Sequence, residues 1–130
     1  RMLRLSYPEA EQMFIRMVFN VLARNCDDHT KNFAFLMDKN GKWTLSPAYD
    51  ICYAYRPGSL WVSSQSLTVN GKREKITDVD FLEVARKMNI KKAEDKIERV
   101  KSAVKKWNEF AEEVKVNALL RDSIMETLLV

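Results

Sequence analysis

The chain has 130 residues, of which 46% are hydrophobic and 31% are charged, and 22 lysines and arginines against 18 acidic residues give a net charge of +4. This composition fits one globular domain, residues 1–130, and excludes a disordered chain; no apolar run approaches the roughly 20 residues that span a bilayer, so no membrane partner is expected. One histidine excludes a zinc site that needs several imidazoles, and two cysteines are typical of reduced thiols in the cytoplasm.

A helix is predicted from Ser6 to about Arg24. Ser6 and Glu9 have the spacing of a capping box, and Pro8 suits a first helical turn. Apolar residues then recur every three or four positions as far as Leu22, so this helix is expected to bury most of its surface.

A polar segment, residues 25–32, separates this helix from a predicted hairpin. Residues 33–37 are apolar and read as a buried strand, and residues 43–45 read as the returning strand. The pair Asn40-Gly41 between them is typical of a tight turn, and Pro47 ends the second strand.

The second half of the chain is predicted to be mostly helical. Residues 56–66 are rich in serine and read as a loop, and residues 67–76 form a second small hairpin around Asn70-Gly71. Three helices are expected to follow, at 77–89, 93–114 and 117–129. The predicted fold class is therefore mostly α with two small β-hairpins.

Basic residues are concentrated in residues 71–106, which carry 12 basic and 7 acidic side chains. One interpretation is a helical interaction or nucleic-acid-binding module that uses this surface. The other is a solvated helix face, because acidic residues alternate with the basic ones at pairing distance. The sequence favours the second interpretation and leaves the first open.

Polar side chains around the first hairpin predict a site. Asp27 and Asn32 lie five residues apart, and Asp50 follows the second strand. Because paired strands bring their outer ends together, these three side chains are expected to converge. Mg²⁺ prefers carboxylate and amide oxygens together with phosphates. The protein-kinase catalytic loop, H-R-D-x-x-x-x-N, has the same spacing, although Ile51-Cys52 replaces the rest of the D-F-G motif.

Each of these residues also has a structural interpretation. An aspartate such as Asp27, between a helix and a strand, often accepts hydrogen bonds from backbone amides. His29 alone is more often structural than chemical, and Asp50 is a common type of turn residue. The short spacing motif is therefore weak by itself.

A longer pattern is more specific. Residues 25–33 read NCDDHTKNF and residues 45–51 read LSPAYDI. These segments resemble the HipA-like toxin kinases, whose catalytic loop reads D-[GD]-H-x-K-N-[FW] and whose later segment reads L-[ST]-P-x-Y-D. Residues 67–72 are similar to the N-G-K hairpin of that family.

The resemblance implies a protein-kinase-like C-terminal lobe of a serine/threonine kinase in a bacterial type II toxin–antitoxin system. It implies that Asp27 is the catalytic base, and that Asn32 and Asp50 bind Mg²⁺ and, with it, ATP. Lys31 would stabilise the transferring phosphate or support the loop. His29 would organise the loop by donating hydrogen bonds that fix the aspartates.

The resemblance also implies partners. They are a protein substrate, for which an aminoacyl-tRNA synthetase is the candidate, and a HipB-like helix-turn-helix antitoxin, through which DNA is reached only indirectly. Asp28 stands where many relatives have glycine, so Asp28→Gly is expected to be tolerated. A pseudokinase lobe kept for scaffolding is a further alternative, which the intact Asp27, Asn32 and Asp50 argue against.

Parts of a kinase are missing from this sequence. It opens on Arg1 without an initiator methionine, and none of its three glycines belongs to a loop that could cover phosphates. We therefore expect the N-terminal lobe, with that loop and its strand lysine, to lie outside this chain. The isolated chain is expected to be inactive.

Overall fold

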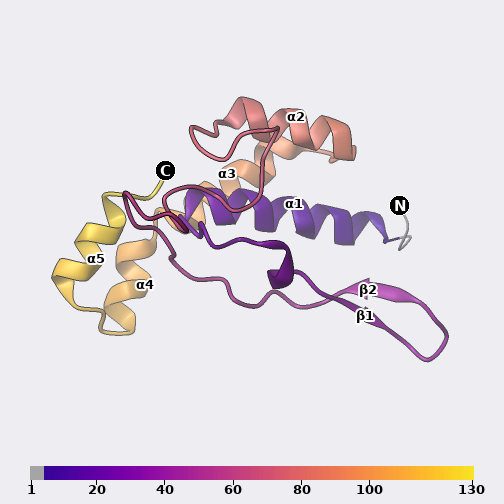
Figure 1. The fold of residues 1–130 in the computed structure, drawn as a ribbon, viewed down its shortest axis with the longest axis horizontal. Coiled ribbons are helices and arrows are strands. Elements are labelled where there is room, and N and C mark those ends of the chain that lie inside the picture. The colour runs from indigo at the N-terminus through magenta and orange to yellow at the C-terminus, as the bar shows by residue number, and fades with distance from the viewer. Residues whose placement is uncertain (1–4) are drawn as a thin grey trace.

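The computed structural model describes residues 5–130 and is mostly helical, as predicted (Figure 1). A 3₁₀ turn and one antiparallel hairpin follow the first helix, and the remaining helices come after a long irregular segment. In chain order the elements are α1 (Tyr7–Leu22), η1 (Thr30–Asn32), β1 (Phe35–Met37), β2 (Trp43–Leu45), α2 (Asp78–Met88), α3 (Ala93–Val104), α4 (Trp107–Glu113) and α5 (Ala118–Met125). Within residues 5–130, no helix is long and apolar enough to cross a bilayer.

Helix α1 is the centre of the fold, with α2 and α3 on one side of it and the hairpin on the other (Figure 1). Phe14 and Val18 of its apolar stripe are fully buried. Phe81 of α2 and Ile97 of α3 belong to the same hydrophobic cluster. Removal of these side chains from water stabilises the packing of the three helices.

Two side chains of α1, from Glu9 and Arg16, hold the end of the hairpin. The predicted capping box is present, since Glu9 Oε2 accepts a hydrogen bond of 2.6 Å from Ser6 N. The other oxygen of Glu9 accepts a bond of 2.8 Å from Leu45 N in β2, and Arg16 Nη2 donates to Ser46 O at 2.7 Å. The chain therefore leaves β2 at a fixed place on α1.

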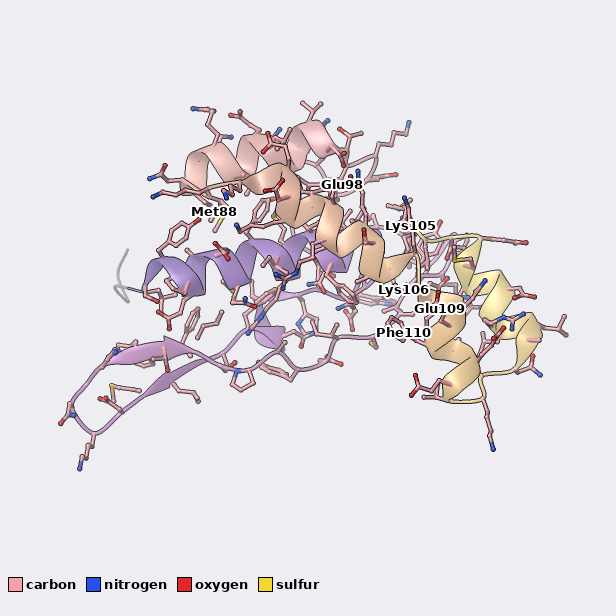
Figure 2. All side chains as sticks on the ribbon, turned by 180° about the vertical axis from the view of Figure 1, so that it is seen from behind. Met88, Glu98, Lys105, Lys106, Glu109 and Phe110 are labelled. Carbon is pink, nitrogen blue, oxygen red and sulfur yellow. The ribbon has the colours of Figure 1, made fainter. Side chains whose placement is uncertain are left out.

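The prediction of one helix over residues 93–114 is wrong. Helix α3 ends at Val104 and α4 begins at Trp107, with a turn at Lys105 and Lys106 between them (Figure 2). The two halves pack against different partners: α3 against α1 and α2, and α4 against α5. Trp107 Nε1 also donates to Arg121 O at 2.9 Å. The unbroken apolar spacing of residues 93–114 therefore indicated buried positions, but it did not show that the packing partners change after Val104.

Two other predicted elements are shorter than expected. At the second hairpin, Val69 and Lys72 exchange backbone hydrogen bonds of 2.8 and 2.9 Å around the Asn70-Gly71 turn, but no strands extend from this bridge. The last helix begins after the cap at Asn117, as predicted, and ends at Met125, before residue 129. The chain then turns back, and Leu129 N donates to Leu22 O at 3.0 Å.

The start of α2 is fixed by Asp80, which is only 1% exposed. Its carboxylate accepts hydrogen bonds from Thr77 N at 2.9 Å and Asn70 Nδ2 at 3.1 Å, and Lys72 Nζ lies 2.9 Å away. These bonds, that from Lys72 above all, hold the pKa of Asp80 well below its usual value.

We expect Asp80→Asn to lower the free energy of unfolding at pH 7. The loss should shrink as the pH falls below about 4, where Asp80 of the unfolded chain takes up a proton while the folded carboxylate stays ionised. Urea denaturation of both proteins at pH 7 and pH 3 measures this. Asp95→Asn, at an exposed position in the first turn of α3, is the control. A loss for Asp80→Asn that does not change with pH would contradict the argument.

Candidate functional site

Two segments that are distant in sequence lie side by side beyond the C-terminal end of α1. Asn25 and Ala54 form a parallel bridge, in which Cys26 N donates to Ala54 O at 3.1 Å and Ala54 N donates to Arg24 O at 3.0 Å. The first segment leads into the predicted catalytic loop, and the second begins at Asp50. The fold therefore brings together the two halves of the predicted site.

Three side chains hold the site together by donating to main-chain carbonyls, one within the first segment and two between the segments. Asn32 Nδ2 donates to Asp27 O at 3.0 Å. The hydroxyl of Tyr49 donates to Lys31 O at 2.7 Å, and Asn25 Nδ2 donates to Asp50 O at a longer 3.4 Å. Each bond ends on a predicted site residue or on its neighbour, so the backbones of Asp27, Asn32 and Asp50 are tied to one another.

The carboxylates of Asp27 and Asp50 remain available to a ligand. The Asp27 side chain is 50% exposed and Asp50 is exposed. Within residues 5–130, neither carboxylate accepts a hydrogen bond from another residue. Burial, followed by the charges of Asp50 and Asp27, raises the pKa of the Cys52 thiol.

The donor atoms fit a hard divalent cation. The amide nitrogen of Asn32 donates to Asp27 O, and no described residue donates to Asn32 Oδ1, which remains available as an acceptor. In the described part of the chain, no three His, Cys, Asp or Glu residues gather to hold a metal by themselves. Mg²⁺ is commonly bound by one or two carboxylates, with substrate phosphates and water as the other ligands, so this set is sufficient only together with a nucleotide.

The predicted hydrogen bonds from His29 to the aspartates are not present. His29 Nε2 lies 3.9 Å from Asp27 Oδ1, which is too long for a hydrogen bond. Its Nδ1 is buried and has no partner among the described residues. The loop is instead held by Asn25, Asn32 and Tyr49. Lys31 is exposed on η1, and its main chain, rather than its ammonium group, takes part in these bonds.

The expectation that Asp28→Gly is tolerated does not fit the structure. Asp28 is buried, and its Oδ1 accepts hydrogen bonds from Ser66 N at 2.7 Å and Leu67 N at 3.2 Å. Burial is the largest influence on its carboxyl group and raises the pKa, although these bonds oppose the effect. Asp28 therefore connects the predicted catalytic loop to residues 66–67, and glycine would remove both bonds.

Sequence reasoning missed Gln65 in the loop predicted over residues 56–66. Gln65 is buried; its Nε2 donates to Asn25 O at 3.0 Å, and its Oε1 accepts from Cys26 Sγ at 3.0 Å. A polar residue among serines carries no sign of burial, so its role becomes visible only in the structure. Asn25 and Tyr49 belong to the motif segments 25–33 and 45–51, but the sequence does not indicate their positioning roles.

The comparison with known proteins identifies the family. The sequence matches the HipA-like C-terminal domain over residues 1–107, and the chain belongs to this family. The match extends from before α1 to the first residue of α4 and includes every predicted site residue, which confirms the resemblance found in the motifs. No curated protein and no solved structure matches the chain.

We expect Asp28→Ala to lower the free energy of unfolding by about 1.5–3 kcal/mol, because two buried amides lose a charged acceptor. Asp38→Ala is a matched control, since Asp38 Oδ1 also accepts two backbone bonds, from Asn40 N and Lys42 N, at the exposed end of the hairpin. Water can replace that acceptor, so the loss should be smaller. Equal losses in urea denaturation would show that the burial of Asp28 has no effect on stability.

Proposed function

We propose that this HipA-like domain is the catalytic lobe of a serine/threonine protein kinase that transfers the γ-phosphate of ATP to a protein hydroxyl. The observation that carries the proposal is the set of three side-chain-to-carbonyl bonds that join the backbones of Asp27, Asn32 and Asp50. They surround two exposed carboxylates to which no other described residue donates. This combination supports a site for a cation and phosphates better than a structural loop.

Asp27 has the properties of the residue that orients the attacking hydroxyl. Its carboxylate is half exposed and free to accept the proton of that hydroxyl. As the hydroxyl oxygen bonds to the γ-phosphorus, the bond from phosphorus to the bridging oxygen breaks and ADP leaves with that electron pair. Lys31, exposed on the adjacent turn, would stabilise the negative charge of the transferring phosphate.

Asn32 and Asp50 would hold Mg²⁺ through the Oδ1 of the amide and the carboxylate. When bound, the cation would neutralise phosphate charge and orient ATP. The phosphate-covering loop and the strand lysine that a kinase needs are proposed to come from an N-terminal lobe. The domain by itself would therefore supply the residue that orients the acceptor hydroxyl and the two Mg²⁺ ligands.

The family supports further proposals about partners. We propose that the protein acts in the cytoplasm together with a HipB-like helix-turn-helix antitoxin, and that it meets DNA only through that antitoxin. An aminoacyl-tRNA synthetase is the proposed substrate.

The alternative of a nucleic-acid-binding module is not favoured by the structure. Within the described residues, five of the 12 basic side chains of 71–106 pair with acids: Lys72 with Asp80, Arg86 and Lys87 with Glu83, Lys96 with Glu11, and Lys101 with both Asp78 and Glu98. Paired lysines release few counterions from a phosphate backbone. Salt-sensitive binding of the isolated chain to DNA would revive this alternative.

In the full-length protein, Asp27→Asn should reduce phosphoryl transfer by a factor of about 10²–10⁴, because the amide does not accept the proton of the hydroxyl. Transfer of radiolabelled phosphate from ATP to protein measures this, and Asp38→Asn on the hairpin turn controls for the loss of a charge. The isolated chain, without an N-terminal lobe, should transfer no phosphate. Robust transfer by Asp27→Asn would overturn the proposed role of Asp27, and robust transfer by the isolated chain would overturn the proposed need for an N-terminal lobe.

Asp50→Asn should weaken the Mg²⁺-dependent binding of ATP. Asp50 has a left-handed backbone, with φ of 53°, and asparagine adopts this conformation as readily as aspartate, so the fold should be preserved. Calorimetric titration of ATP with and without Mg²⁺ separates the contribution of the cation. We expect the advantage that Mg²⁺ gives to ATP binding to be lost in the variant. An unchanged advantage would show that Asp50 is not a ligand.

A further inference from the structure

We propose that Tyr49 is a positioning residue, whose hydroxyl fixes the place of Asp50 relative to Asn32. This inference rests on the proposed function, because it concerns the two residues that would hold Mg²⁺. The Tyr49 hydroxyl donates to Lys31 O at 2.7 Å. Because Tyr49 precedes Asp50 and Lys31 precedes Asn32, this bond joins the residues that directly precede the two ligand positions.

The core does not explain the presence of Tyr49. Tyr49 is 41% exposed and is not part of the hydrophobic cluster around α1. The directional hydroxyl bond is the feature that distinguishes tyrosine from phenylalanine here. That bond joins two residues 18 positions apart, with the whole hairpin between them.

A second hydrogen bond restrains the backbone of Asp50. Its φ of 53° lies in the left-handed region, which is unfavourable for a residue with a Cβ atom. Asn25, which is only 1% exposed, donates to Asp50 O at 3.4 Å. The bonds made by Tyr49 and Asn25 therefore restrain the backbone from which the Asp50 side chain projects before a ligand arrives. Such preorganisation lowers the cost of binding a cation that demands defined geometry.

The chain offers a matched control for removal of this hydroxyl. Tyr53 also makes one hydroxyl bond, of 2.9 Å, to Thr127 Oγ1 beyond the end of α5. Tyr49→Phe and Tyr53→Phe thus delete the same atom and one hydrogen bond each. Only the first deletion separates the segment of Asp50 from the turn of Asn32.

The experiment measures the binding of Mn²⁺ to the protein by electron paramagnetic resonance in the presence of ATP, with Mn²⁺ used in place of Mg²⁺. The proteins are full-length wild type, Tyr49→Phe, Tyr53→Phe and Asp50→Asn. We expect Tyr49→Phe to weaken Mn²⁺ binding about five-fold, the equivalent of one hydrogen bond. Tyr53→Phe should bind Mn²⁺ as the wild type does. Tyr49→Phe should bind ATP without metal as tightly as the wild type does. Its midpoint of thermal unfolding should equal that of Tyr53→Phe.

The outcomes separate this inference from the function on which it rests. If Asp50→Asn weakens Mn²⁺ binding and Tyr49→Phe does not, Tyr49 has no positioning role and the proposed function stands. Equal weakening by Tyr49→Phe and Tyr53→Phe also overturns the inference, because the effect is then a general structural one. If the wild type binds no Mn²⁺ in the presence of ATP, both proposals are wrong.

Discussion

The irregular segments around the site must satisfy their own main-chain polar groups, and this constraint organises the whole region. Residues 25–32 and 50–54 lie mostly outside regular helices and strands, so their carbonyls need other donors. Asn25, Asn32, Tyr49 and Gln65 supply those donors from their side chains. The same bonds that stabilise the loop therefore also fix the distances between the backbones from which Asp27 and Asp50 project.

Helix α1 makes these bonds possible because it positions both halves of the site. Its C-terminal end leads directly into residues 24–28, while Glu9 in its first turn and Arg16 just past its middle hold residues 45 and 46. The chain from β2 to Asp50 thus starts at one place on the helix, and the catalytic loop starts at another. Since an α-helix is stiff over this length, packing of α1 in the core determines where the two segments meet.

Local signals in the sequence predicted most of the fold and the two segments that meet at the candidate site. The capping residues Ser6 and Thr77 and the turn at Asn40-Gly41 act over a few positions, and the structure has helices and a hairpin where they indicate. The break before Trp107 escaped prediction because its cause is a change of packing partner, which periodicity does not report. Gln65 and Asp28 escaped because polar residues within polar loops give no sign of burial.

The adjacent aspartates show how structure separates residues that sequence treats alike. Asp28 is buried, and its carboxylate already accepts two backbone hydrogen bonds, so little of its capacity remains for a ligand. The side chain of Asp27 is half exposed, and no residue in the described part of the chain donates to its carboxylate. An acceptor that is left without protein donors is the one free to meet a substrate hydroxyl. The environment of each carboxylate therefore supports Asp27, rather than Asp28, as the residue that would act in catalysis.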